Sequence, residues 1–277
     1  MRATIFCSSM RIGIKLSRVA PKDSTDAHLS QRFRHVVAAL ALLAVAALPA
    51  SAYTGHRGHA SAARPLSALA RQGKLIFGNT PQLASAWVGG RLRCTDCHRI
   101  DGTIPNALPM FGVAHHYPSF SKRAGHTITL EQRIQECFVR SENGKPLPLE
   151  STQMKALVAY LNYLSDGSPR HKPQPSMVHL PALTGNPARG KAIYMAQCSS
   201  CHQDDGSGIP AAFPPLWGSS AYNDGAGMHR ISVLAAWTQH NMPLNSPGSL
   251  TAQQAYDVAA YIHEQPRPKF NPQYKRY

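Results

Sequence analysis

Two segments of the chain, 151–163 and 251–262, carry apolar residues at three- and four-residue spacing, which predicts amphipathic helices. Each begins with a serine or threonine, a residue type that caps helix N-termini. Shorter helix-like segments, 66–77 and 187–197, lie upstream of the first and second helix respectively. Because this pair of elements occurs twice, the sequence predicts an internal duplication of small all-α domains, in each of which the last helix crosses the first.

The stretch between the two copies is rich in proline and lacks helical periodicity. Residues 166–186 are therefore predicted to be a linker between the domains. The predicted N-terminal domain covers residues 53–165, and the predicted C-terminal domain covers residues 187–277 and ends in a basic tail.

Residues 1–52 are predicted to be a secretory signal peptide. The uncharged apolar run 36–48 is shorter than the roughly 20 residues that span a bilayer, so no stable membrane anchor is expected. Basic residues precede this run, and Ala50-Ser51-Ala52 follows it as a small-residue cleavage site. An uncleaved anchor is the alternative, and Met10 is an alternative start. Export predicts a periplasmic protein.

The chain has a net charge of +15, of which +10 would remain after removal of seven basic and two acidic residues with the signal. Such a surplus is typical of proteins that bind nucleic acid, an anionic partner or a small anionic substrate. The sequence has no aromatic-basic pattern of the kind found in RNA-binding proteins. We therefore expect an anionic partner or substrate and no nucleic acid.

The strongest chemical signal is a repeated Cys-x-x-Cys-His motif. It occurs at Cys94, Cys97 and His98 and again at Cys198, Cys201 and His202. This is the attachment motif of a c-type haem, in which the thiols form thioethers and the histidine binds iron. A zinc site or redox dithiol is the alternative. Two copies on an exported chain favour two covalently bound haem c groups, and hence two tandem cytochrome c-like domains.

Each haem iron also has a second axial position. In the second domain, Met242 precedes a proline shortly before the last helix, and a thioether there would raise the reduction potential. We predict Met242 as the ligand opposite His202. The alternatives in this domain are His240, Met228 and His229.

The first domain has a cysteine at the equivalent place. Cys137 lies 39 residues after His98, whereas Met242 lies 40 residues after His202. Cys137 would be the mature chain's one thiol outside the haem motifs, so iron ligation by its thiolate would explain it. We predict Cys137 as the distal ligand or active-site sulfur, with a buried inert cysteine as the alternative. Competing ligands are Met110, His115, His116 and His126.

Basic residues surround Cys137. If residues 130–139 are helical, Arg133 and Cys137 lie on one face, and Arg140 could share it. Guanidinium groups bind oxyanions through paired hydrogen bonds, so the pattern predicts an anion site next to a sulfur. A solvated basic helix is the alternative.

With these motifs the chain resembles the dihaem thiosulfate dehydrogenases, also called tetrathionate synthases. The most specific part is Arg133-Ile-x-x-Cys137-Phe-x-Arg140-Ser141-x-Asn143-Gly144-Lys145-Pro146, together with the two haem motifs. The resemblance implies that the first haem, with histidine and cysteine ligands, is the active site and that the second relays electrons. By motif position it implies that Arg123, Arg133 and Ser141 bind substrate, with Lys145 as a further cation.

The implied reaction is oxidation of two thiosulfates to tetrathionate, in either direction. Electrons would leave to an external acceptor such as a small cytochrome or a high-potential iron-sulfur protein. Cys137 either forms a transient sulfonate adduct or remains bound and tunes the iron. The alternatives from other classes are a dihaem electron carrier without its own substrate, a haem peroxidase, and a haem subunit that transfers thiosulfate to a partner's cysteine.

Overall fold

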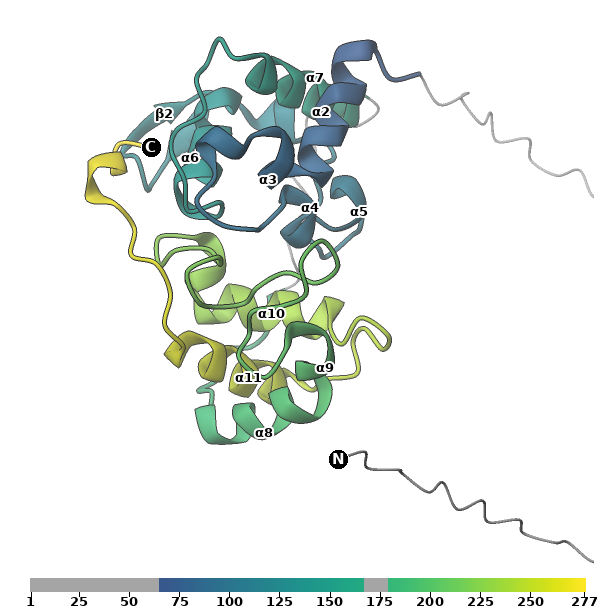
Figure 1. Cartoon of the computed structure of the whole chain (residues 1–277), viewed down its shortest axis with the longest axis vertical. Coiled ribbons are helices and arrows are strands. Elements are labelled where there is room, and N and C mark those ends of the chain that lie inside the picture. The colour runs from purple at the N-terminus through teal and green to yellow at the C-terminus, as the bar shows by residue number, and fades with distance from the viewer. Residues whose placement is uncertain (1–64, 167–178) are drawn as a thin grey trace, which may run out of the picture. The chain divides into compact units, whose positions relative to one another are not determined.

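The structure, a computed structural model, describes residues 65–166 and 179–277, which form two helical halves of one unit from Ala63 to Tyr277 (Figure 1). The predicted signal peptide and residues 167–178 of the predicted linker lie outside the described residues. The prediction of a mainly helical chain is confirmed, with one small hairpin added.

The first half contains its helices in the order expected and a two-stranded antiparallel sheet between them. The elements are α2 (Ala68–Gly78), α3 (Thr80–Leu83), η1 (Ser85–Trp87), α4 (Cys94–Cys97), α5 (Arg99–Gly102), η2 (Val113–His116), β1 (Ser119–Ser121), β2 (His126–Ile128), α6 (Leu130–Arg140) and α7 (Thr152–Asp166). In the hairpin Ser119 pairs with Ile128 and Ser121 with His126.

The second half repeats the helical part of this order without a hairpin. Its elements are α8 (Pro187–Gln197), α9 (Ser199–His202), η3 (Gly227–His229), α10 (Ile231–Asn241), α11 (Ala252–Glu264) and η4 (Pro272–Tyr274). No helix of the described residues is both long and apolar enough to cross a membrane.

Local sequence explains where the long helices begin. Thr129 and Thr251 form capping boxes with the glutamine three residues on, in which each hydroxyl accepts from the glutamine N–H. The Ser151 hydroxyl accepts from Met154 N at 3.1 Å at the start of α7. The two hydroxyl caps predicted from the sequence, Ser151 and Thr251, are therefore present.

A glycine lies at the helix crossing of each half. A Cβ at Gly73 of α2 would lie 1.9 Å from the Ala156 carbonyl oxygen of α7, and a Cβ at Gly190 of α8 would lie 1.9 Å from the Asp257 carbonyl oxygen of α11. Only glycine allows backbones to approach so closely. The duplicated pairs of helices thus cross at equivalent glycines.

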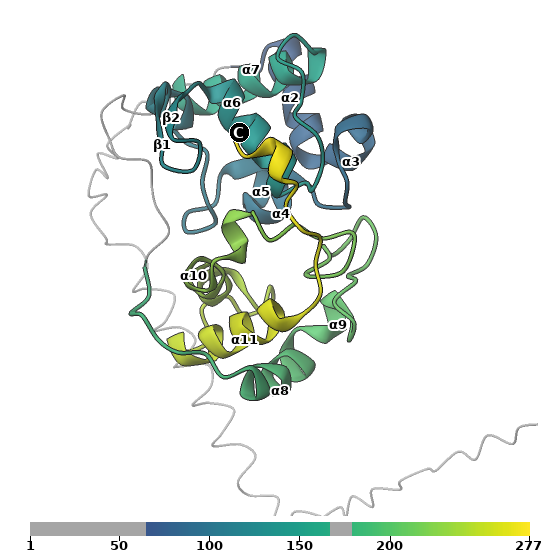
Figure 2. The ribbon, with the colours of Figure 1, turned by 90° about the vertical axis from the view of Figure 1, so that its left-hand side faces the viewer.

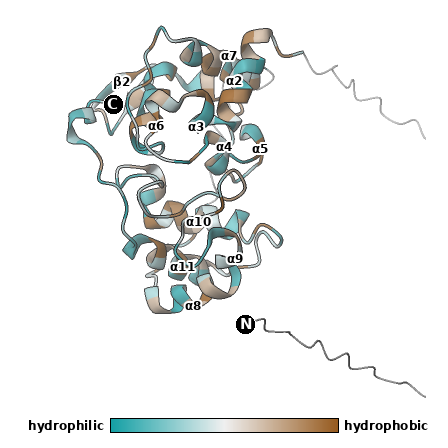
Figure 3. Ribbon diagram, in the orientation of Figure 1, coloured by the Kyte–Doolittle hydropathy of each residue, from teal (hydrophilic) through white to brown (hydrophobic). Residues whose placement is uncertain are grey.

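Two hydrophobic cores result, one in each half. The first includes Phe77, Phe138 and Tyr160, and the second is built around Tyr194 and Trp237. The helices carry both hydrophobic and hydrophilic segments, as expected of helices that bury one face (Figure 3). The first haem motif is divided between the cores, because Cys94 packs against the first and Cys97 against the second.

Candidate functional site

The first Cys-x-x-Cys-His motif occupies α4, and His98 follows directly. The Nδ1 atom of His98 lies 2.6 Å from the Leu108 carbonyl oxygen, which leaves Nε2 available as a metal ligand. Burial lowers the pKa of His98 to about 4, and the nearby positive charge of Arg133 acts in the same direction. The imidazole is therefore neutral near pH 7, the form that binds iron.

The second motif has the same arrangement. His202, at the end of α9, is 8% exposed, and its Nδ1 lies 3.0 Å from the Pro214 carbonyl oxygen. Burial lowers its pKa as well. Both histidines are thus held by a backbone carbonyl on the ring nitrogen that would not bind iron.

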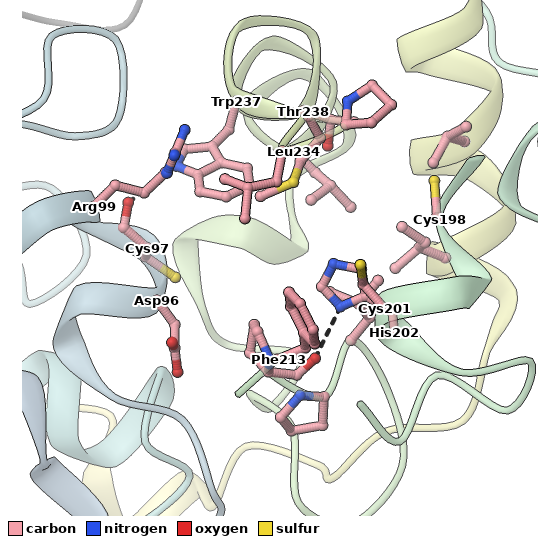
Figure 4. Close-up of a pocket in the computed structure, with 18 of the residues that line it drawn as sticks. Asp96, Cys97, Arg99, Cys198, Cys201, His202, Phe213, Leu234, Trp237 and Thr238 are labelled. Atoms are coloured by element: carbon pink, nitrogen blue, oxygen red, sulfur yellow. Dashed lines mark hydrogen bonds between the residues drawn. The ribbon is translucent and has the colours of Figure 1, made fainter. Parts of the chain in front are cut away.

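A cavity of about 930 Å³ lies beside the second motif. Its walls include Cys201, His202 and Met242, and its lining is mainly apolar, with Leu234 and Trp237 contributed by α10 (Figure 4). A volume of this size suits a large cofactor. The thiols, the fixed neutral imidazole and a thioether in an apolar cavity are a donor set that fits a covalently attached haem.

The candidate ligands for this cavity differ in position. Met242 follows α10 and lines the cavity, as Met228 does, whereas His240 is not among the lining residues. His229 stacks on His263 with ring centroids 4.3 Å apart. The geometry therefore favours Met242 over the two histidines.

Residues of the first haem motif form the opposite wall of the same cavity. Cys97 lies across the cavity from His202 (Figure 4). The Trp237 indole donates a hydrogen bond to the Cys97 carbonyl at 3.0 Å. The Asn241 side chain, directly before Met242, donates to the Asn106 carbonyl at 2.9 Å. The two haem segments are therefore joined through α10.

Cys137 lies on α6, one helical turn from a guanidinium group. Arg133 Nη1 is 3.5 Å from Cys137 Sγ and 3.1 Å from Glu136 Oε2. The Cys137 thiolate, more than any other group, raises the pKa of Arg133, and Tyr117 and Glu136 add to this effect. Arg133 is thus a permanent cation whose charge is directed at the sulfur.

The same sulfur is close to the first haem motif. Burial and Glu142 raise the pKa of Cys94, and the negative charge of Cys137 raises it further. Cys137 acts in the same way on Cys97, after burial and two carboxylates. Glu142 links the two places, because its N–H donates to the Cys137 carbonyl at 3.0 Å and its Oε1 lies 4.0 Å from Cys94 Sγ. The structure therefore brings Cys137 and Arg133 together with a motif that lies about 40 residues away in sequence.

The other predicted site residues are Arg123, Ser141 and Lys145. Arg123, in the turn of the hairpin, has a pKa lowered by burial and by the neighbouring Arg133. Ser141 follows α6, and its N–H donates to the Cys137 carbonyl at 2.8 Å. Lys145 is exposed, and within the described part of the chain its side chain makes no hydrogen bond or ion pair.

The competing ligands named for the first domain have other surroundings. Met110 packs against the first core and lies over Gly102. His126 is exposed on β2, and its Nδ1 lies 3.1 Å from the carbonyl oxygen of Ala124, two residues earlier.

Comparison with known proteins agrees with these features. Residues 89–169 match the family described as SoxA/TsdA, cytochrome c domain, and residues 187–266 match the cytochrome c family. The thiosulfate dehydrogenase of Stutzerimonas stutzeri (strain A1501) is 40% identical over 209 residues, which cover 73% of this chain and 68% of that protein. This chain belongs to the thiosulfate dehydrogenase family.

Other thiosulfate dehydrogenases give the same result. The enzyme from Allochromatium vinosum is 39% identical over 212 residues, which cover 72% of this chain and 78% of that protein. A solved structure, the thiosulfate dehydrogenase (TsdBA) from Marichromatium purpuratum in its "as isolated" form, matches with a TM-score of 0.68 at 34% identity. That match covers 72% of this chain and 46% of the solved chain, so this chain spans about half the length of that structure.

Membership of the thiosulfate dehydrogenase family confirms two predictions. The chain has two tandem cytochrome c domains, and it binds two haem c groups covalently. The two-domain prediction depended on the repeated motif and the repeated helices, and both halves match haem-domain families separately.

Two buried carboxyl groups near Cys137, those of Glu136 and Glu142, were not predicted from the sequence. Glu136 is 4% exposed, pairs with Arg133 and accepts a hydrogen bond from Ser121 at 3.0 Å. Its spacing of three residues after Arg133 was the available signal. Glu142 is 3% exposed with Oε1 4.0 Å from Cys94 Sγ, and burial raises its pKa well above the usual range. Nothing local in the sequence indicates this buried carboxyl.

Proposed function

We propose that this protein oxidises two thiosulfate dianions to one tetrathionate dianion and passes two electrons to an external acceptor. The observation that carries the proposal is the contact between Arg133 and Cys137 beside the first haem motif. The haem groups, when bound, supply sites that take up and pass on single electrons. Everything else in the reaction depends on how the chain binds and orients anions.

The first requirement is to bring two dianions together. Arg133 and Arg123 would offset their mutual repulsion, because each guanidinium stays charged and offers paired donors to sulfonate oxygens. The positive charge at Arg133 is fixed by Glu136 and directed at Cys137. Ser141 would orient one oxygen by donating a hydrogen bond from its hydroxyl, and the exposed Lys145 would add a further cation.

The second requirement is a sulfur that reacts with sulfur. In the covalent route the Cys137 thiolate and one thiosulfate lose two electrons and form a Cys–S–S–SO₃⁻ adduct. The terminal sulfur of a second thiosulfate then attacks the adduct sulfur that is bonded to Cys137 Sγ, and the bond from Sγ to that sulfur breaks, which releases tetrathionate and restores the thiolate. In the alternative route Cys137 would remain a ligand of the first haem together with His98 and would only tune its potential, as Met242 together with His202 would tune the second haem.

The test is tetrathionate formation by the haem-loaded protein with thiosulfate and ferricyanide, beside Cys137→Ala. The control is Lys275→Gln, a surface substitution distant from either haem motif in sequence, and both variants are checked for full haem content. Tetrathionate from wild type and control, and none from Cys137→Ala, supports the covalent route. If Cys137→Ala still forms tetrathionate, the covalent route is excluded and Cys137 only tunes the potential of the first haem. No tetrathionate from fully loaded wild type, in either direction, refutes the proposal.

A dihaem carrier without its own substrate is the second candidate. Such a carrier has no use for an arginine held against a sulfur at 3.5 Å, so this contact argues against it. The peroxidase and the partner-dependent haem subunit are separated by the same assay, because the first needs peroxide and the second needs another chain.

We also propose that the protein acts in the periplasm, since covalent haem attachment and the predicted signal peptide both require export. The acceptor would be a small cytochrome or a high-potential iron-sulfur protein. Leu244 lines the cavity beside His202 and is 49% exposed, so it would offer such a protein an apolar contact. Reduction of the haems by thiosulfate, followed by reoxidation on adding such a protein, tests this step.

A further inference from the structure

The last residues of the chain form a strap from the second half to the helix that carries Cys137. The C-terminal strap, residues 266–277, leaves α11 and ends beside α6 (Figures 1 and 2). The sequence predicts only a basic tail at this end of the second domain. The hydrogen bonds of the strap indicate a different use.

The strap is first fixed to a loop of the second half. Gly218 N donates to the Pro266 carbonyl at 2.8 Å, and Phe270 N donates to Asp224 Oδ1 at 2.7 Å. Lys269 forms an ion pair with the same Asp224 at 3.2 Å. These contacts involve backbone as well as side chains, so the path of the strap is defined.

The end of the strap then holds Arg140, the last residue of α6. Arg140 Nη2 donates to the Tyr277 main-chain oxygen at 2.5 Å, and its guanidinium lies 4.1 Å from the centre of the Phe270 ring. Arg140 is only 5% exposed. A Cβ at Gly225 would come within 3.0 Å of both Arg140 and Phe270, so the loop closes tightly over this pair.

The same loop also caps α6. The side chain of Asn223 donates to the Val139 carbonyl at 2.9 Å, and its backbone N–H donates to the Arg140 carbonyl at 3.2 Å. Asn223 is 2% exposed. Carbonyls at a helix C-terminus lack partners within the helix, so residues of the second half supply them here.

Arg140 lies on the face of α6 that carries the chemistry. Residues 133, 137 and 140 are spaced by four and three positions, which places them on one side of the helix. Within the described residues, the side-chain hydrogen bond of Arg140 goes to Tyr277 and not to Cys137 or Glu136. The strap thus anchors the face that Arg133 and Cys137 share.

We propose that Arg140 is a positioning residue for the thiosulfate site. The strap and Asn223 fix the last turn of α6 through it, and this sets the direction in which Arg133, Cys137 and Ser141 face. The inference rests on the proposed function for its kinetic test but not for its spectroscopic one.

The test compares Arg140→Met, Arg140→Lys and Phe270→Leu with Lys275→Gln. Lys275 is an exposed cation of the same strap, so its loss removes an equal charge without touching Arg140. Arg140→Met loses a charged hydrogen bond, and we expect the KM for thiosulfate to rise about tenfold or more, with a smaller change in kcat. Arg140→Lys should restore part of this loss. Phe270→Leu should raise KM by about two- to fivefold, and Lys275→Gln should leave it unchanged.

The second readout is the electron paramagnetic resonance spectrum of the oxidised protein without substrate. The signal of the iron centre near Cys137 should shift or broaden in Arg140→Met and Phe270→Leu, and the signal of the centre near His202 should not. If Arg140→Met does not accumulate, Phe270→Leu carries both measurements. An unchanged KM and spectrum, or equal changes in Lys275→Gln, would overturn the proposal. If wild type does not turn over, the proposed function fails while the spectra still decide whether Arg140 positions α6.

Discussion

Replacing Gly73 by alanine tests whether helix propensity or helix packing decides the stability of the α2–α7 crossing. In an exposed helix this change stabilises by about 1 kcal/mol, because glycine costs that much relative to alanine. In α2 the new Cβ would lie 1.9 Å from the Ala156 carbonyl oxygen and 2.8 Å from the Tyr160 Cβ. No side-chain rotation relieves a clash with backbone, so α2 and α7 must move apart. Overpacking costs about 1–3 kcal/mol, and a clash with backbone that no rotamer relieves belongs in the upper part of this range, at about 2–3 kcal/mol, which exceeds the propensity gain of about 1 kcal/mol.

The assay is thermal unfolding followed by the circular dichroism of the helical band. For a unit of this size each kcal/mol shifts Tm by about 2–4 °C, so a net loss of 1–2 kcal/mol should lower Tm by about 2–8 °C. The matched control is Gly78→Ala on the same helix, where the nearest atom to the new Cβ is 3.8 Å away. That variant should melt at the wild-type temperature or slightly above it. A Tm for Gly73→Ala at or above wild type would refute the packing argument.

Three further outcomes are expected. Arg133→Met should raise the KM for thiosulfate about tenfold or more, and by a larger factor than Lys145→Met does, because of these two residues Arg133 contacts Cys137 and Lys145 does not. Equal increases in KM for the two variants in steady-state assays would contradict this. Trp237→Phe should lower the free energy of urea unfolding by about 1–3 kcal/mol, since the partly buried Cys97 carbonyl loses its donor; a change below about 0.5 kcal/mol would count against it. Acidification should destabilise the protein at the stacked pair His229 and His263, because burial lowers the pKa of both imidazoles, that of His263 to about 4. The contribution of the pair to folding stability is full above about pH 6.5 and is lost as the pH falls toward 4. When Tm is measured against pH, it should fall less steeply in His263→Gln than in wild type.

Local patterns explain what the sequence could predict. The haem motifs, the hydroxyl caps at Ser151 and Thr251, and the repeated pairs of helices depend on residues close together in the chain. The proximity of Cys137 to the first motif was also predictable, because Cys137 follows His98 at nearly the same sequence distance as Met242 follows His202. The contact of Arg133 with Cys137 then follows from helix geometry alone.

Partners far apart in sequence explain what was missed. Asn223 caps α6 from about 80 residues away, and Tyr277 binds Arg140 across 137 positions. An asparagine in a loop and a basic tail have no periodicity that would indicate such contacts. The hairpin of β1 and β2 was missed because its strands have three residues each, too few for an alternating pattern.

The division of the first haem motif between two cores limits how this architecture can be rearranged. Because Cys97 and Leu108 pack with the second half, a gene encoding the first half alone would specify a protein with one wall missing. Joining the first domain at the linker to a different second domain would preserve these contacts only if the new domain reproduced the face of α10 that carries Trp237 and Asn241. The two domains therefore depend on each other as one compact unit, and fusions to other proteins should be made outside residues 65–277.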